Sequence, residues 1–159
     1  MARAYVGLGA NLGDARATLA TAFDALAALP RTTLAARSSI WRSAPIDSSG
    51  PDYLNAAAAL DTALEPRALL DALLAIEAVQ GRQRPYYNAP RTLDLDLLLY
   101  GEQVLDSPRL TLPHPRLHRR AFVLAPLLEL WPDGVVPGHG RLDALLAAIA
   151  DQRVERAER

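Results

Sequence analysis

Hydrophobic positions follow two different periods along this chain. Where apolar and polar residues alternate, successive side chains face opposite sides of an extended backbone, and the pattern predicts a β-strand. Where apolar residues recur every three or four positions, as Leu19, Phe23 and Leu26 do, the pattern predicts an amphipathic helix. On this basis we expect strands at 4–8, 32–43, 53–62 and within 90–100, and helices at 15–29 and 66–81.

The order of these elements is strand, helix, strand, strand, helix, strand. That order is typical of an α+β protein with a ferredoxin-like βαββαβ core, in which helices cover one face of an antiparallel sheet. Two further helices, near 119–130 and 142–150, are expected to extend this core and to cover the second face. The charged tail 152–159 is predicted to fray. The chain has 159 residues, so we expect a single domain spanning residues 1–159.

Two aspartates in the last predicted strand are the most informative residues of the sequence. Asp94 and Asp96 are two positions apart, so their side chains point to the same side of the strand. Neighbouring carboxylates repel each other, and a bound cation removes that repulsion. A pair of carboxylates suits Mg²⁺, which completes its shell with water and phosphate oxygens, and Arg91 is close enough in sequence to contact a phosphate. The alternative is a solvated strand face that carries two ordinary aspartates.

Composition and charge narrow the possible function classes. The net charge is −1, so no overall basic field favours binding to nucleic acid. All 17 basic residues are arginines, which excludes a P-loop because that motif requires a lysine. The sequence has no cysteine, which excludes disulfides and cysteine-ligated metals. We find no signal-like leader and no apolar run of about 20 residues, and we therefore expect a cytoplasmic protein.

Further groups of residues carry candidate chemistry. Tyr53 and Asn55 share one face of a predicted strand, where a ring and an amide can bind a flat heterocycle, although ordinary sheet surface fits them equally well. His114 lies between two prolines in an arginine-rich segment suited to a polyphosphate. A loop beside the aspartates contains three arginines that form a predicted phosphate clamp: Arg82, Arg84 and Arg91.

The glycines of segment 7–13 do not have the spacing of a dinucleotide-binding fingerprint. We therefore predict a tight turn there, which uses the conformational freedom of glycine.

Motifs in order along nearly the whole chain carry a family resemblance. They are AYVGLGANLGD, SSIWRSAPI, PDYLNAAAAL, IEAVQGR, PRTLDLDLLLYG and LTLPHPRLHRRAFVLAPLLEL. With these motifs the chain resembles the 6-hydroxymethyl-7,8-dihydropterin pyrophosphokinases of folate biosynthesis. The resemblance implies a monomeric enzyme with a ferredoxin-like core, which uses ATP and two Mg²⁺ ions. The resemblance further implies that such an enzyme moves the terminal diphosphate of ATP onto the hydroxymethyl group of the pterin and releases AMP.

The resemblance also implies a role for individual residues. Asp94 and Asp96 would hold the two Mg²⁺ ions, and Arg82 and Arg91 would act with them in catalysis. The pterin would be bound by Ser43, Ala44, Ile46, Tyr53, Asn55 and Phe122. ATP would be bound by Glu77, Arg82, Arg84, Arg91, Leu97, Arg109, Thr111, His114 and Arg120.

One departure from the family pattern falls in the arginine-rich loop, where Asn88 and Ala89 stand in place of a common Trp-Gly pair.

Two other functions are compatible with the residues themselves. The first is a Mg²⁺-dependent nucleotidyltransferase, which would transfer AMP and release pyrophosphate. The second is a non-catalytic, ferredoxin-like module that binds nucleotide without turnover.

Overall fold

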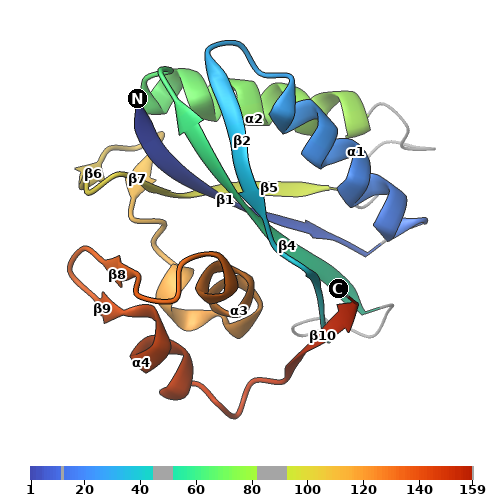
Figure 1. Cartoon of the computed structure of the whole chain (residues 1–159), viewed down its shortest axis with the longest axis vertical. Coiled ribbons are helices and arrows are strands. Elements are labelled where there is room, and N and C mark those ends of the chain that lie inside the picture. Colours follow the sequence, from blue (N-terminus) through green and yellow to red (C-terminus); the bar gives the residue numbers. More distant parts are fainter. Residues whose placement is uncertain (12, 45–51, 82–92, 159) are drawn as a thin grey trace.

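The computed structural model describes residues 1–11, 13–44, 52–81 and 93–158, which form an α+β fold with an antiparallel sheet (Figure 1). The helices are α1 (Ala15–Ala27), α2 (Pro66–Gly81), α3 (Ala121–Leu130) and α4 (Leu142–Ala147), with a short 3₁₀ turn at Leu117–Arg119. The main strands are β1 (Ala2–Ala10), β2 (Thr32–Arg37), β3 (Ile40–Ser43), β4 (Tyr53–Thr62), β5 (Asp94–Tyr100) and β10 (Val154–Glu158). The small hairpin strands are β6 (Leu105–Asp106), β7 (Thr111–Leu112), β8 (Val135–Val136) and β9 (Gly140–Arg141).

The main sheet has the strand order β10-β3-β4-β1-β5, and β2 also pairs with β4. Its ladders are antiparallel. The α+β class and the antiparallel sheet are therefore confirmed. The N-cap of α1 is Asp14, whose carboxylate accepts a hydrogen bond from the backbone N–H of Ala17 at 3.1 Å.

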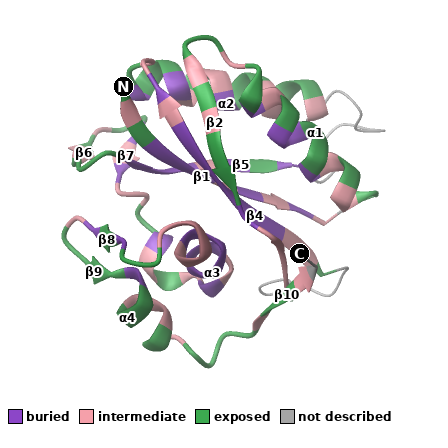
Figure 2. Ribbon diagram, in the orientation of Figure 1, coloured by how far each residue is buried: buried purple, intermediate pink, exposed green. Residues whose placement is uncertain are grey.

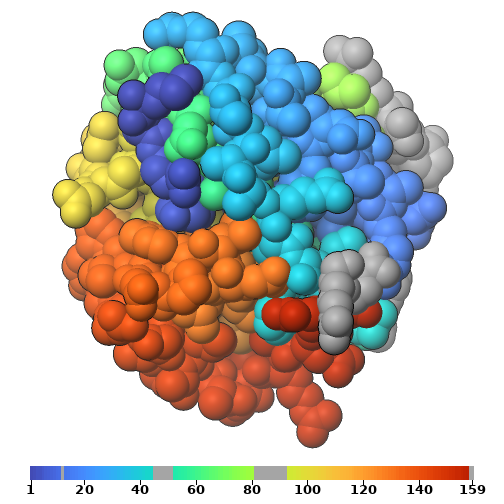
Figure 3. Space-filling view, viewed as in Figure 1, coloured from blue at the N-terminus to red at the C-terminus, as the bar shows by residue number. Residues whose placement is uncertain are grey.

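Each face of the sheet has its own hydrophobic core (Figure 2). Alternate residues of β1, including Val6 and Leu8, pack with α1 and α2 on one face. Tyr5 points to the other face and packs with residues of α3, such as Leu124. The segment that contains α3 and α4 gathers along one side of the molecule in Figure 3. Helices α1 and α2 therefore lie against one face of the sheet, and α3 lies against the other.

The register of the sheet aligns polar residues with glycines on the face that α3 covers. Gly9 of β1 lies opposite Asn55 of β4 on one side and opposite Asp94 of β5 on the other. In the next row, Gly7 pairs in the same way with Asp96 on β5. Glycine has no side chain, so both rows leave open floor beside the aspartates. Two strand spacings, roughly 10 Å, separate the backbones of Asn55 and Asp94.

Three sequence predictions need correction. The strand expected at 32–43 is two strands, because Ser38 bonds to Ala57 on β4 through both its backbone N–H and its hydroxyl, and this interrupts the strand. The tail does not fray: Val154–Glu158 forms β10, which pairs with the outer edge of β3. The glycine segment is not one turn, since Gly7 and Gly9 lie within β1.

Among the described residues, no helix has both the length and the apolar character needed to cross a membrane.

Candidate active site

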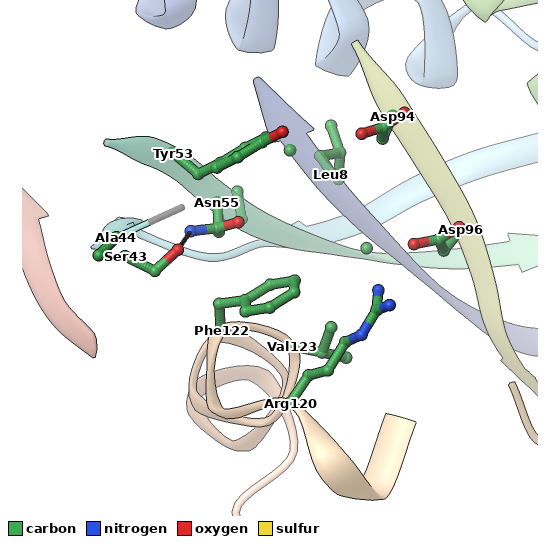
Figure 4. A pocket seen from close by; sticks show the side chains of 13 residues that line it. Leu8, Ser43, Ala44, Tyr53, Asn55, Asp94, Asp96, Arg120, Phe122 and Val123 are labelled. Carbon is green, nitrogen blue, oxygen red and sulfur yellow. Dashed lines mark hydrogen bonds between the residues drawn. The ribbon is translucent and has the colours of Figure 1, made fainter. Parts of the chain in front are cut away.

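A cavity of about 370 Å³ lies between the sheet and the N-terminal end of α3 (Figure 4). Tyr53 and Asn55 project into it from β4, and Phe122 and Val123 from α3. The residues that line it are Gly7, Leu8, Gly9, Ser43, Ala44, Tyr53, Asn55, Ala56, Asp94, Asp96, Arg120, Phe122 and Val123. The expected site residues that fall here are thus drawn together from β3, β4, β5 and α3.

A buried polar pair forms one wall of this first cavity. Asn55 is only 2% exposed, and its side-chain amide donates a hydrogen bond to the Ser43 hydroxyl at 2.9 Å. Since an amide has two N–H donors and one carbonyl acceptor, Asn55 keeps bonding capacity for a ligand. The rings of Tyr53 and Phe122 provide flat apolar surface on either side of it. This wall can therefore bind a planar heterocycle that has polar edges.

A second cavity, of about 360 Å³, is bounded by α2, β5 and the segment 108–115. Its polar lining includes Glu77, Arg109, Thr111 and His114. Its lining residues are Leu70, Leu74, Glu77, Asp94, Leu95, Asp96, Leu97, Pro108, Arg109, Leu110, Thr111, His114 and Pro115. Asp94 and Asp96 line both cavities, so the two carboxylates lie at the junction between them.

Two contacts hold β5 at the outer edge of the sheet. The Glu77 carboxylate accepts a hydrogen bond from the backbone N–H of Leu95 at 2.7 Å, and Leu95 lies between the two aspartates. The backbone N–H of His114 donates to the carbonyl of Leu98 at 2.9 Å. Glu77 and His114 therefore fix the backbone on both sides of Asp96.

The imidazole of His114 faces Asp96. Its Nδ1 accepts a hydrogen bond from the backbone N–H of Arg116 at 3.2 Å, so a neutral ring carries its proton on Nε2. Nε2 lies 3.7 Å from a carboxylate oxygen of Asp96. Burial lowers the pKa of His114, opposed by the charge of Asp96. The charges of Arg120 and Arg116 also lower this pKa, and the net shift is downward.

Two arginines that we expected at the nucleotide have different positions in the structure. Arg109 lines the second cavity and is paired with Asp71 of α2. Arg120, which was expected on the nucleotide side, lines the first cavity, and its guanidinium carbon lies 5.5 Å from the centre of the Phe122 ring. Four expected residues lie outside the described part of the chain: Ile46, Arg82, Arg84 and Arg91.

Sequence reasoning missed lining residues that carry little or no chemistry of their own. Gly9 was assigned to a turn and Gly7 was given no part in a cavity, but both form the open floor of the first cavity. Their spacing of two on a strand was the signal that one face has no side chains there. Nothing in the sequence set Val123 apart, because it is one of several apolar residues in a predicted helix.

The donor set at the junction fits a hard divalent cation. No cluster of three or more metal-ligating side chains occurs in the residues that the structure describes. Mg²⁺ does not require such a cluster, since it is commonly held by one or two carboxylates, with water and phosphate oxygens as the other ligands. Asp94 is exposed and the Asp96 side chain is 42% exposed, so both remain accessible to water and to a phosphate-bound ion.

Comparisons with known proteins agree with this geometry. Residues 5–132 match the family 7,8-dihydro-6-hydroxymethylpterin-pyrophosphokinase (HPPK). The 2-amino-4-hydroxy-6-hydroxymethyldihydropteridine pyrophosphokinase of Pseudomonas aeruginosa is 50% identical over 155 residues, which cover 97% of this chain and 96% of that protein. The protein of the same name from Methylorubrum extorquens is 47% identical over 160 residues, covering 99% of this chain and 100% of that protein.

Solved structures of low sequence identity share the fold. Wild-type HPPK-DHPS of Plasmodium falciparum superposes with a TM-score of 0.73 at 12% identity, over 94% of this chain and 45% of that chain. An HPPK-DHPS structure in complex with substrates gives a TM-score of 0.73 at 11% identity, over 94% of this chain and 43% of that chain.

Fold and site together define an α+β enzyme in which two substrate-sized cavities meet at a pair of carboxylates. The chain belongs to the HPPK family, whose match covers most of its length. It is an ATP-dependent pyrophosphokinase of folate biosynthesis.

Proposed function

We propose that the chain binds 6-hydroxymethyl-7,8-dihydropterin in the first cavity and ATP in the second, and transfers the diphosphate of ATP across their junction. The observation that carries this proposal is that Asp94 and Asp96 line both cavities. A group transfer between two bound substrates requires such a shared boundary, because the reacting atoms must approach within about 3–3.5 Å.

The first cavity has the properties that a pterin requires. Tyr53 and Phe122 offer ring surface, and Asn55 offers an amide for the polar edge of the heterocycle. Ser43 orients that amide, and Ala44 extends the wall. Ile46 belongs to the same proposed pocket through the family resemblance.

The second cavity has the properties that a nucleotide requires. Leu97 and its apolar neighbours suit the base, whereas Arg109, Thr111 and His114 supply donors. The remaining proposed ATP ligands are Glu77 at this cavity, Arg120 at the first cavity beside the aspartates, and three arginines from the resemblance: Arg82, Arg84 and Arg91.

In the proposed reaction, the hydroxymethyl oxygen of the pterin forms a bond to the β-phosphorus of ATP. The bond from that phosphorus to the α–β bridging oxygen breaks, AMP leaves with the electron pair, and the proton of the hydroxyl is released to water. Asp94 and Asp96 would hold two Mg²⁺ ions, which neutralise phosphate charge when they are bound. The side chains of the first cavity orient the hydroxyl, and Arg120 together with Arg82 and Arg91 would stabilise charge on the transferred group.

We also propose a more specific fold, a domain organisation, a cellular location and an oligomeric state. The order β3-β4-β1-β5, joined through α1 and α2, supports a ferredoxin-like βαββαβ core. We infer one domain over residues 1–159, and a cytoplasmic monomer, in keeping with the family resemblance.

Metal counting tests the assignment of the aspartates. Mn²⁺ binding in the presence of a non-hydrolysable ATP analogue can be followed by electron paramagnetic resonance. We expect two ions per wild-type chain, and fewer for Asp94→Asn and Asp96→Asn. Asp61→Asn is the matched control, because Asp61 pairs with Arg3 on the surface and lines neither cavity. Wild-type stoichiometry and turnover in the Asp96 variant would remove this residue from the metal site.

A further inference from the structure

One carboxylate outside both cavities binds three donors at once. Glu129 lies near the C-terminal end of α3. One of its oxygens accepts hydrogen bonds from the backbone N–H and the hydroxyl of Ser39, each at 2.9 Å. Its other oxygen accepts a hydrogen bond from the indole Nε1–H of Trp41, also at 2.9 Å. Glu129 thus joins α3 to the start of β3, 88–90 residues away in sequence.

Arg156 of β10 completes this cluster. It lies opposite Trp41 in the β3–β10 ladder, and its guanidinium carbon is 5.2 Å from the centre of the indole ring. The same guanidinium lies 3.9 Å from Glu129. Burial raises the pKa of Glu129, but the hydrogen bonds from Ser39 and Trp41 and the charge of Arg156 outweigh that effect, so the pKa is lowered. The carboxylate is therefore ionised when it binds its partners at neutral pH.

One partner of Glu129, Trp41, lies in the same row of the sheet as the polar wall of the first cavity. Trp41 is the ladder partner of Asn55, and Ser43, two residues further along β3, is the ladder partner of Tyr53. Residues two apart on a strand share a face, so Trp41 and Ser43 both point toward α3. Ser43 is in turn the hydroxyl that binds the Asn55 amide.

The opposite wall of the cavity belongs to the same helix as Glu129. Phe122 and Val123 lie at the N-terminal end of α3 and line the cavity. A single helix therefore carries one wall at its start and, near its end, the carboxylate that holds the strand of the other wall. Any shift of β3 relative to α3 would change the distance between Phe122 and Ser43, the hydroxyl that binds the Asn55 amide.

We propose that Glu129 is a positioning residue for the heterocycle-binding cavity: by holding Ser39 and Trp41, it fixes β3 against α3 and sets the width and register of the pterin pocket. This inference rests on the proposed function for the identity of the ligand. It assigns Glu129 no contact with substrate, and it predicts an effect on pterin binding that the nucleotide cavity does not share. The second cavity is built from α2, β5 and residues 108–115. The hydrogen bonds and the ion pair of Glu129 involve Ser39, Trp41 and Arg156, which belong to other parts of the fold.

Glu129→Gln tests this role at constant side-chain volume. An amide has one carbonyl acceptor, so the variant must place its NH₂ group against the donors of either Ser39 or Trp41. We expect the dissociation constant of 6-hydroxymethyl-7,8-dihydropterin to rise about tenfold, since small misplacement of binding groups weakens recognition strongly. That constant is measured by calorimetry with Mg²⁺ and a non-hydrolysable ATP analogue. The affinity for the analogue alone should change less than about twofold.

Two further variants make the outcome decisive. Trp41→Phe keeps an aromatic side chain but removes the five-membered part of the indole with its N–H, so we expect a smaller rise in the pterin dissociation constant, about threefold, even if Glu129→Gln fails to fold. Asp61→Asn makes the same change in charge on β4, away from the Glu129 cluster, and should leave pterin affinity unchanged.

A lower melting temperature with unchanged affinity for both ligands would make Glu129 a stabilising residue only and would overturn the proposal. Equal weakening of both ligands would overturn it as well. Absence of pterin binding by the wild type would instead contradict the proposed function itself.

Discussion

Replacing Asn55 with alanine separates the two cavities of the enzyme experimentally. The amide of Asn55 is 2% exposed, lines the first cavity and binds Ser43 at 2.9 Å. It is absent from the lining of the second cavity. The substitution should therefore weaken pterin binding and leave ATP binding nearly unchanged.

The size of the effect follows from the groups left without partners. Loss of the amide removes a hydrogen-bond partner from the pterin edge, and leaving a buried polar group unsatisfied costs about 1–3 kcal/mol. Loss of the bond to Ser43 also frees that hydroxyl to rotate, and ordering it again when the pterin binds adds roughly 1 kcal/mol. We expect a total of about 2–4 kcal/mol, or roughly a 30- to 900-fold rise in the pterin dissociation constant.

The assay is equilibrium binding of each ligand to the wild type and to Asn55→Ala. The matched control is Thr62→Ala, which removes another buried polar side chain at the far end of β4. Thr62 bonds to Thr32 and to the backbone of Leu64, and it lines neither cavity. Equal weakening of ATP and pterin binding by Asn55→Ala, or an unchanged pterin affinity, would show that Asn55 is not a specific ligand of the pterin.

Other perturbations test separate parts of the structure. Glu77→Ala removes the acceptor for the backbone N–H of Leu95 and should raise the Mg²⁺ concentration needed for half-maximal activity about tenfold, whereas an unchanged requirement would exclude this support for β5. Because the pKa of Glu129 is lowered, its ionised form stabilises the fold above its ordinary pKa, and that stability is lost as pH falls through the lower native pKa. Urea unfolding should therefore show a weaker pH dependence in the acid range for Glu129→Gln than for the wild type, and identical profiles would refute this linkage. A methyl group on Gly134 would lie 2.6 Å from atoms of Trp131. Gly134→Ala should therefore lower the free energy of unfolding by about 1–3 kcal/mol and leave the pterin KM unchanged. A wild-type melting temperature would show that the neighbouring side chains can move aside.

Local periodicity was sufficient to predict most of the main elements. Helix α2 begins at Pro66 and ends at Gly81, as Pro and Gly preferences at helix ends indicate. Features that depend on distant contacts could not be predicted in this way. The strand expected at 32–43 is interrupted at Ser38, which bonds to a neighbouring strand. The charged tail forms β10 because β3 offers it an open edge, and no local pattern encodes that edge.

The candidate site likewise combines features that local sequence predicts with features that depend on distant contacts. The spacing of Asp94 and Asp96 predicted a shared face, and the register with Gly7 and Gly9 places that face beside an open floor. That these carboxylates lie between two cavities depends on the β1–β5 register and on the position of His114, which the order of residues in the chain does not encode. Arg109 and Thr111 were predicted from the family resemblance alone.

Pyrophosphoryl transfer between the two cavities yields AMP and a pterin diphosphate, so the identity of the products is the measurement that tests this reaction. Purified protein is incubated with ATP, Mg²⁺ and 6-hydroxymethyl-7,8-dihydropterin, and the nucleotides and pterins are separated by ion-exchange chromatography. We expect one AMP for each pterin diphosphate, formed only when the pterin is present. Release of ADP or of free pyrophosphate, or tight ATP binding without turnover, would contradict this expectation.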